Sequence, residues 1–335
     1  MSIQVSDESQ TAGNTGSSDY PVVVFVADDH YAMPLAAAIS SVVVNLGRDQ
    51  KAHVFIVDGG ISRTNKEKIM QSEDRERVRI QWLQPDESHC DLLKSLPCGY
   101  VGRTSYYKML IPELLGPEYS RIVYLDSDVI VEGDITDLCV AELGNNYVLA
   151  VQDLINPLVS SPFGLRNWRK LERKADDELF NTGVLVLNAA KWRKENVTLR
   201  LVQYLRDHYQ YVQLCDQDAM NAVFRGVWGR LNTLWNVLPY MNVARSYSLL
   251  SKKSHEDLLT RAHLLHYCGP SKPWNTRCRH PQRDRFFHYL DMTAWSGWRP
   301  KWWVVDRNVF VYYMRRVLTI LRRKLCISTR SQVSE

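Results

Sequence analysis

Short apolar runs alternate with helical segments through the first part of the chain. Each run is rich in β-branched residues and stops at a polar cluster, which is typical of buried strands. The strands predicted in this way cover residues 21–27, 53–57 and 77–83. Helical composition follows at 35–46 and 63–72, and Ser62 is placed to cap the second helix. Alternating strands and helices predict an α/β fold, with a mostly parallel sheet that carries helices on both faces and binds ligands at the carboxyl ends of its strands.

The same alternation continues in the middle of the chain. Further helices are predicted at 102–115, 189–209 and 215–225, and further strands at 121–131, 147–151 and 180–188. Residues 154–179 lose this periodicity and contain two prolines, so we expect a long excursion from the sheet of the kind that forms lids or binding loops. Residues 1–19 hold no Lys, Arg or aromatic residue and predict a disordered leader. We therefore divide the chain into this leader, a domain over 20–290 and a tail over 291–335.

Charge sets the tail apart from the rest of the chain. The formal net charge is +5, but residues 299–335 hold nine Lys or Arg against two acids, so the remainder is slightly acidic. This distribution argues against a nucleic-acid-binding surface. Over 295–325, tryptophans interleave with basic residues, which predicts an amphipathic helix that lies on an anionic membrane surface. The alternative is a C-terminal helix that packs on the body.

Cysteine usage and hydropathy point to a cytoplasmic location. The seven cysteines are odd in number and form no CxxC pair, which favours reduced thiols over disulfides or a zinc site. No apolar run reaches the ~20 residues needed to cross a bilayer, and the first residues do not resemble a secretory signal. We expect a cytoplasmic protein that is peripheral on the inner face of the cytoplasmic membrane.

The run YLDSDVIV at 124–131 places two carboxylates, those of Asp126 and Asp128, inside an otherwise apolar strand. Side chains at i and i+2 share one face of a strand, and two such anions repel unless a divalent cation such as Mn²⁺ or Mg²⁺ binds between them. Alternatively, the strand ends at Leu125 and the acids are turn residues that face water. A third possibility is a phosphatase of the haloacid-dehalogenase type with Asp126 as nucleophile, although that family places the motif close to its first strand.

Five motifs together carry a family resemblance. They are ADDHY at 27–31, YLDSDVIV at 124–131, FNTGVLVLN at 180–188, CDQDAMN at 215–221 and HYCGPSKPW at 266–274. Their order resembles the signature of glycosyltransferase family 8, and the chain looks like a bacterial retaining galactosyl- or glucosyltransferase that extends lipopolysaccharide. The resemblance covers about residues 21–274. It implies a GT-A fold with a Rossmann-like sheet, UDP-glucose or UDP-galactose as donor, Mn²⁺ with Mg²⁺ as the alternative, and a glycolipid or saccharide acceptor.

The resemblance also implies roles for individual residues. The metal ligands would be Asp126, Asp128 and His266. The UDP-binding residues would be Ala27, Asp29, Tyr31, Ser127, Gly269 and Lys272. The sugar-binding residues would be Arg103, Asp126, Asn181, Asp216 and Gln217. The catalytic residues would be Asp153, Asp216 and Gln217.

Several of these residues have an ordinary structural alternative. Asp29 could cap a helix, and His266 could be a buried core histidine. Arg103 and Asp216 could form a structural ion pair. Because the amide of Gln217 is a poor nucleophile, we expect front-face transfer rather than a double displacement. A non-catalytic protein that binds nucleotide sugars remains a further alternative, and glucose and galactose are not distinguished.

Overall fold

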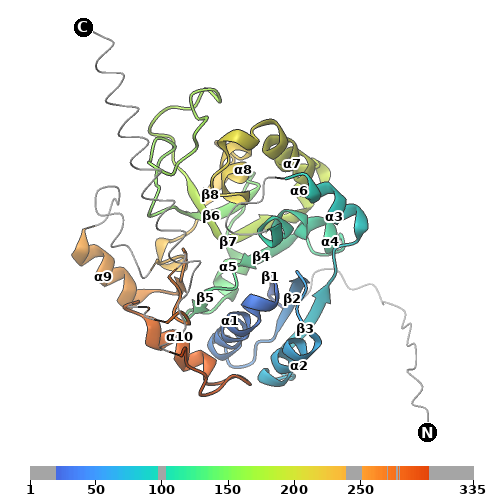
Figure 1. Cartoon of the computed structure of the whole chain (residues 1–335), viewed down its shortest axis with the longest axis vertical. Coiled ribbons are helices and arrows are strands. Elements are labelled where there is room, and N and C mark those ends of the chain that lie inside the picture. Colours follow the sequence, from blue (N-terminus) through green and yellow to red (C-terminus); the bar gives the residue numbers. More distant parts are fainter. Residues whose placement is uncertain are drawn as a thin grey trace.

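The computed structural model describes residues 20–96, 103–238, 251–269, 271–276, 278 and 280–301. Within this part of the chain, the central sheet has seven strands in the order β3-β2-β1-β4-β7-β6-β8 (Figure 1). They are β1 (Val22–Ala27), β2 (Ala52–Asp58), β3 (Val78–Leu83), β4 (Arg121–Leu125), β6 (Val148–Gln152), β7 (Phe180–Asn188) and β8 (Trp228–Arg230). Among these strands only β7 runs antiparallel to its neighbours, so its first residues lie at the carboxyl ends of β4 and β6. The predicted mostly parallel sheet is confirmed.

Helices cover both faces of this sheet (Figure 1). Along β1, Val24 packs into one apolar cluster and Phe25 into the other, on the opposite face of the sheet. Burial on both faces is why these strands read as uninterrupted apolar runs. The helices on one side include α1 (Ala32–Asn45), α2 (Arg63–Ser72) and α5 (Thr136–Val140). The other side holds η2 (Arg103–Leu110), α4 (Ile111–Leu114), α6 (Ala189–Lys194), α7 (Val197–Asp207) and α8 (Asp216–Val223), with α3 (Glu87–Lys94) beside them.

A second, two-stranded sheet lies beside the first and joins distant parts of the chain. It pairs β5 (Val129–Val131) with β9 (Leu264–His266) in antiparallel register, so that Val129 stands opposite His266. Ile130 and Leu265 of this sheet pack with α9 (Lys252–Arg261) and α10 (Arg283–Leu290), and its other apolar residues pack with the cluster around α1. The remaining short elements are η1 (Asp29–Tyr31), η3 (Tyr209–Tyr211) and η4 (Thr233–Trp235).

The prediction of one continuous strand over 121–131 is wrong. The strand β4 ends at Leu125, residues 126–128 form a turn, and β5 continues in the other sheet. Long-range hydrogen bonds hold this turn, because the Ser127 hydroxyl donates to the carbonyl of Val26 at 2.8 Å and the amide of Asp126 donates to the carbonyl of Gly183 at 2.8 Å. The two carboxylates therefore converge through a turn, and not through the pleat of a strand.

Two predicted helices are also divided. The segment 189–209 breaks between α6 and α7, where Asn196 takes the left-handed conformation with φ of 49°. In 102–115, the described residues form the 3₁₀ helix η2 and then the short α4, whose first turn accommodates Pro112. The excursion at 154–179 is confirmed, since its residues contain no helix or strand and form one isolated bridge, between Leu158 and Glu178.

The beginning of the predicted membrane-associating tail packs on the body. Trp295 is partly buried against the apolar clusters, and Lys68 lies 5.3 Å from its ring centroid. Arg299 forms a 2.6 Å ion pair with Asp291. Residues 302–335 lie outside the described residues, as does the predicted leader 1–19. None of the helices in the described ranges has the length and apolar character needed to cross a membrane.

Candidate active site

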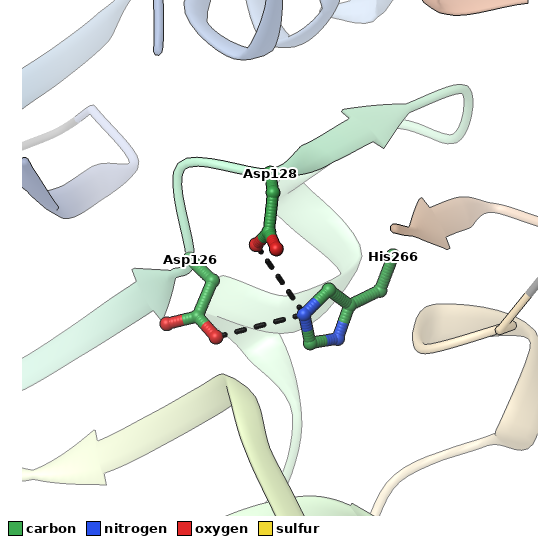
Figure 2. A group of neighbouring side chains, drawn as sticks. All are labelled: Asp126, Asp128 and His266. Carbon is green, nitrogen blue, oxygen red and sulfur yellow. Dashed lines mark ion pairs between the residues drawn. The ribbon is translucent and has the colours of Figure 1, made fainter. Parts of the chain in front are cut away.

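Asp126, Asp128 and His266 meet just beyond the carboxyl end of β4 (Figure 2). His266 Nε2 lies 3.6 Å from Asp126 Oδ2 and 3.4 Å from Asp128 Oδ1, and the three potential ligand atoms all lie within 4.8 Å of one another. The turn after β4 supplies the two carboxylates, and the pairing of β5 with β9 supplies the imidazole. The structure thus brings together all three predicted metal ligands.

The surroundings of this cluster fit a divalent cation. Two carboxylates and one imidazole make an oxygen and nitrogen donor set of the kind that binds Mn²⁺. The backbone of β7 closes one side at Gly183, where a Cβ atom would lie 2.2 Å from His266 Cε1 and 2.9 Å from Asp126 Oδ2. Glycine is therefore required there, because any side chain would displace two of the three ligands.

Lys272 neutralises the Asp128 side of the cluster. Its ammonium group forms an ion pair with Asp128 and donates to the carbonyl of Tyr267 at 2.8 Å. Burial alone would raise the pKa of Asp128, but the charge of Lys272 holds it well below its ordinary value. The rings of Tyr31 and Trp274 lie 5.9 and 6.0 Å from the ammonium and meet edge to face. Two of the predicted UDP-binding residues, Tyr31 and Lys272, are therefore neighbours.

A second lysine, Lys108, occupies the Asp126 side. Its ammonium lies 3.1 Å from Asp126 Oδ1 and 3.0 Å from Asp216 Oδ2, donates to the carbonyl of Thr182 and sits over the ring of Tyr124. Burial would lower the pKa of Lys108, but the two carboxylates raise it well above its ordinary value. Lys108 was not among the site residues predicted from the sequence. Its signal was a single lysine inside the apolar run YYKMLI at 106–111.

The three predicted catalytic residues gather beside Lys108. Gln217, in the first turn of α8, donates from Nε2 to Asp153 Oδ2 at 2.8 Å, and its Oε1 accepts from the amide of Thr182 at 3.3 Å. The Thr182 hydroxyl donates to Asp216 Oδ2 at 2.9 Å, and the Asn181 side-chain amide reaches Gln217 Oε1 at 3.4 Å. These residues meet because the start of β7 lies at the carboxyl ends of β4 and β6.

The remaining predicted residues lie at the ends of other elements. Ala27 is the buried last residue of β1, and Gly269 has a φ of +90°, a conformation that favours glycine. Ser127, in the turn after β4, is buried and donates its hydroxyl hydrogen to the carbonyl of Val26 in β1. Arg103 is exposed at the first position of η2, so Lys108, and not Arg103, is the basic residue that pairs with Asp216.

Asp28, and not Asp29, caps the helical turn that follows, so the structural alternative considered for Asp29 is wrong. Asp29 has another structural role. One of its carboxylate oxygens accepts from the backbone amide of Ser62 and from the side chain of Asn65, both at 2.8 Å. These hydrogen bonds lower the pKa of Asp29. They connect the turn after β1 to the first turn of α2. The contact of Asp29 with a nucleotide stays a prediction.

Comparison with known proteins assigns the class. The family model described as Glycosyl transferase family 8 matches residues 22–278. General stress protein A of Bacillus subtilis (strain 168) is 28% identical over 281 residues, which cover 82% of this chain and 94% of that protein. Lipopolysaccharide 1,2-glucosyltransferase of Escherichia coli (strain K12) is 28% identical over 317 residues, which cover 92% of this chain and 87% of that protein.

A solved structure has the same architecture. The crystal structure of the galactosyltransferase LgtC in complex with donor and acceptor sugar analogs matches with a TM-score of 0.69 and 26% identity, covering 84% of this chain and 98% of LgtC. The fold and the site define a GT-A glycosyltransferase, as predicted. The chain belongs to glycosyltransferase family 8.

Proposed function

We propose that the protein transfers glucose or galactose from a UDP-sugar to a glycolipid or saccharide acceptor, with retention of anomeric configuration and assistance from Mn²⁺ or Mg²⁺. The observation that carries this proposal is that a candidate metal cluster, a lysine suited to phosphate and a polar site suited to a sugar lie side by side. The carboxylate and imidazole cluster shares Asp128 with Lys272 on one side, and shares Asp126 with Lys108 and Asp216 on the other. The diphosphate of a bound UDP-sugar would lie on the Lys272 side of the cluster, and its hexose would lie on the side of Lys108 and Asp216.

Asp126, Asp128 and His266 would hold the divalent cation. When bound, the cation supplies Lewis-acid stabilisation of the charge that develops on the diphosphate leaving group. Lys272 offers a second positive charge for the same phosphates, since its ammonium already pairs with an anionic oxygen of Asp128. Tyr31 and Trp274 place aromatic faces beside that ammonium and would border the nucleotide.

The residues around Gln217 would bind the hexose. Lys108, Asp216 and Asn181 present donors and acceptors that suit sugar hydroxyls. Hydrogen bonds to Asp153 and to the backbone of Thr182 fix the Gln217 amide, which keeps its carbonyl dipole in one orientation. In the proposed front-face reaction, this dipole stabilises positive charge at the anomeric carbon, and the departing phosphate oxygen takes the proton of the acceptor hydroxyl.

Relatives support a saccharide acceptor on a lipid. One relative is named as a lipopolysaccharide glucosyltransferase, and the LgtC structure is described with donor and acceptor sugar analogs. The proposed place of action is the inner face of the cytoplasmic membrane. The excess of basic residues over 299–335 would hold the protein near anionic lipid.

The central experiment is a panel of UDP-sugars incubated with the purified full chain, with and without Mn²⁺, in which release of UDP is measured. We expect metal-dependent release from UDP-glucose or UDP-galactose, and none from the Asp128→Ala variant. Tight UDP binding without release would instead indicate the non-catalytic alternative. Phosphate release from simple esters without UDP would indicate a phosphatase.

Two further measurements test the finer parts of the proposal. Gln217→Ala should leave reduced but measurable transfer, and complete loss with normal donor binding would contradict the front-face reaction. Flotation of the full chain with vesicles tests the membrane proposal. We expect binding to vesicles that contain anionic lipid, and equal recovery with neutral vesicles would contradict an electrostatic attachment.

A further inference from the structure

Asn236 lies directly behind the candidate metal ligand His266 and was not among the site residues predicted from the sequence. It follows η4 and is 1% exposed. The next residue, Val237, forms backbone hydrogen bonds with Leu264 and His266 of β9. The side-chain nitrogen of Asn236 donates to Asn181 Oδ1 at 2.9 Å, and its side-chain oxygen lies 3.0 Å from His266 Nδ1. Asn236 therefore links the imidazole to the start of β7.

The orientation of the Asn236 amide follows from a fixed backbone donor. The backbone N–H of Gly183 donates to a side-chain atom of Asn181 at 2.9 Å, and because an N–H can only donate, that atom is the oxygen. The same oxygen faces Asn236, so Asn236 must present its NH₂ group there. Its oxygen then faces His266 Nδ1. Since an amide oxygen only accepts, Nδ1 carries the hydrogen.

A neutral imidazole carries one N–H, so a hydrogen on Nδ1 leaves Nε2 with a lone pair. Nε2 is the atom that faces Asp126 and Asp128, at 3.6 and 3.4 Å. A lone pair and two carboxylates then point at one another with no proton between them, an arrangement that a cation would stabilise. Hydrogen bonds that fix the tautomer of a ligating histidine in this way are common around metal sites.

We propose that Asn236 is a positioning residue, which holds His266 in the Nδ1-protonated tautomer and so presents Nε2 to a divalent cation between Asp126 and Asp128. This inference rests on the proposed function, in which the cluster binds metal. The same chain of amides continues from Asn181 to Gln217 and Asp153. Asn236 therefore also ties the metal ligand to the sugar side of the site.

The test uses the metal-free full chain and two variants of nearly equal size. Asn236→Leu removes the acceptor, whereas Asn236→Asp keeps it. Histidine ¹⁵N NMR at about pH 8, where an ordinary imidazole is neutral, reports the tautomer, and the His266→Gln spectrum assigns the signal. Electron paramagnetic resonance of free Mn²⁺ gives the dissociation constant. Asn232→Leu is the matched structural control, because the exposed Asn232 caps η4 through the amide of Leu234.

We expect a hydrogen on Nδ1 of His266 in the wild-type protein. The Mn²⁺ dissociation constant should rise ~10–100-fold in Asn236→Leu, the usual effect of losing such a partner. It should change little in Asn236→Asp and in Asn232→Leu. A ring without a hydrogen on Nδ1 in the wild-type protein, or wild-type Mn²⁺ affinity in a folded Asn236→Leu variant, overturns the inference.

The two proposals fail in different ways. If the wild-type protein binds no Mn²⁺, the metal-dependent function fails, while the tautomer of the metal-free ring still decides the role of Asn236. If Asn236→Leu does not fold, the wild-type spectrum and the Asp variant decide. Loss of Mn²⁺ affinity in a folded Asn236→Asp variant would then count against the inference, because that variant keeps the acceptor.

Discussion

The two carboxylates of the turn after β4 are separated by a single residue, yet each forms an ion pair with a different lysine, and the two lysines have different surroundings. On the Asp126 side, Lys108 comes from η2 and lies between Asp126 and Asp216, with the Tyr124 ring and the Thr182 carbonyl around it. On the Asp128 side, Lys272 follows β9, is bonded to the Tyr267 carbonyl and has two aromatic rings about 6 Å away.

The difference indicates separate tasks for the two lysines. Lys108 holds together the buried carboxylate of Asp216 and the partly buried carboxylate of Asp126, which would otherwise repel each other. Lys272 pairs with Asp128, one of the proposed metal ligands. A bound cation could therefore replace Lys272 beside Asp128, and a diphosphate could replace Asp128 beside Lys272. We propose that Lys108 serves mainly the folded state and that Lys272 serves mainly ligand binding. Four substitutions test this distinction.

Asp128→Asn should have the largest effect, because it removes a proposed metal ligand and the partner of Lys272 while it keeps the size of the side chain. We expect the kcat/KM for UDP-sugar turnover to fall by ~10³–10⁴-fold, equivalent to ~4–5.5 kcal/mol of transition-state stabilisation. Steady-state kinetics over a range of Mn²⁺ concentrations measure it. Asp137→Asn, at an exposed position of α5, is the matched control. Near wild-type turnover in Asp128→Asn would remove Asp128 from the metal site.

Lys108→Met should have the second largest effect, and on stability. It leaves the buried carboxylate of Asp216 and the partly buried one of Asp126 without their cation, which costs about 3–4 kcal/mol in the free energy of unfolding, within the range for a broken buried pair. The pKa of Asp216 is already raised by burial, so proton uptake would limit the loss. Urea unfolding at neutral pH measures it.

The control for Lys108 is the double variant Lys108→Met with Asp216→Asn. Removal of one anion should recover part of the lost stability, because the remaining carboxylate no longer faces a second charge. A double variant as unstable as the single one would show that Lys108 acts through packing. Lys108 would then not be the charge that holds the two acids together.

Lys272→Met should affect binding more than stability. Loss of one charged contact to the diphosphate corresponds to ~1.5–3 kcal/mol, so the KM for the UDP-sugar should rise ~10–100-fold with a smaller change in kcat. Lys170→Met is a suitable control, because that exposed lysine bonds to the Tyr211 hydroxyl on the surface. If Lys272→Met instead destabilises the protein as much as Lys108→Met, the distinction between the two lysines fails.

The pattern of apolar residues correctly predicted the strands that are buried on both faces of the sheet. The strands predicted at 21–27 and 53–57 match β1 and β2, because strands buried on both faces must be apolar throughout. The break between β4 and β5 was not predictable in this way. It depends on hydrogen bonds from Asp126 and Ser127 to residues of β7 and β1.

The same limit applies to the candidate site. The paired acids of the turn were visible as a motif, but His266 was identified only through the order of the family motifs. Lys108 and Asn236 carry no motif, and their roles depend on the packing of η2 against α8 and of η4 against β9. Polar side chains that act on other side chains need a three-dimensional structure to be recognised.

The smallest effect is expected for an ion pair on the surface. Asp291 pairs with Arg299 at 2.6 Å, but 38% and 46% of their side chains are exposed, so solvent screens the pair. Asp291→Asn keeps an acceptor for the Gly297 amide and removes only the charge, and it should cost less than ~1 kcal/mol at neutral pH. Urea unfolding with and without added salt measures it, since salt weakens exposed pairs.

The pH dependence of this pair has a definite sign. The hydrogen bond and charge of Arg299, with the hydrogen bond from Gly297, lower the pKa of Asp291 to about 2. Because folding lowers this pKa, the pair contributes stability above about pH 4 and loses it as the pH falls toward 2. The difference between the wild-type protein and Asp291→Asn should therefore shrink over that range. A cost as large as that of Lys108→Met would mean that burial does not set the value of these ion pairs, and the contrast drawn between the buried lysines would lose its physical basis.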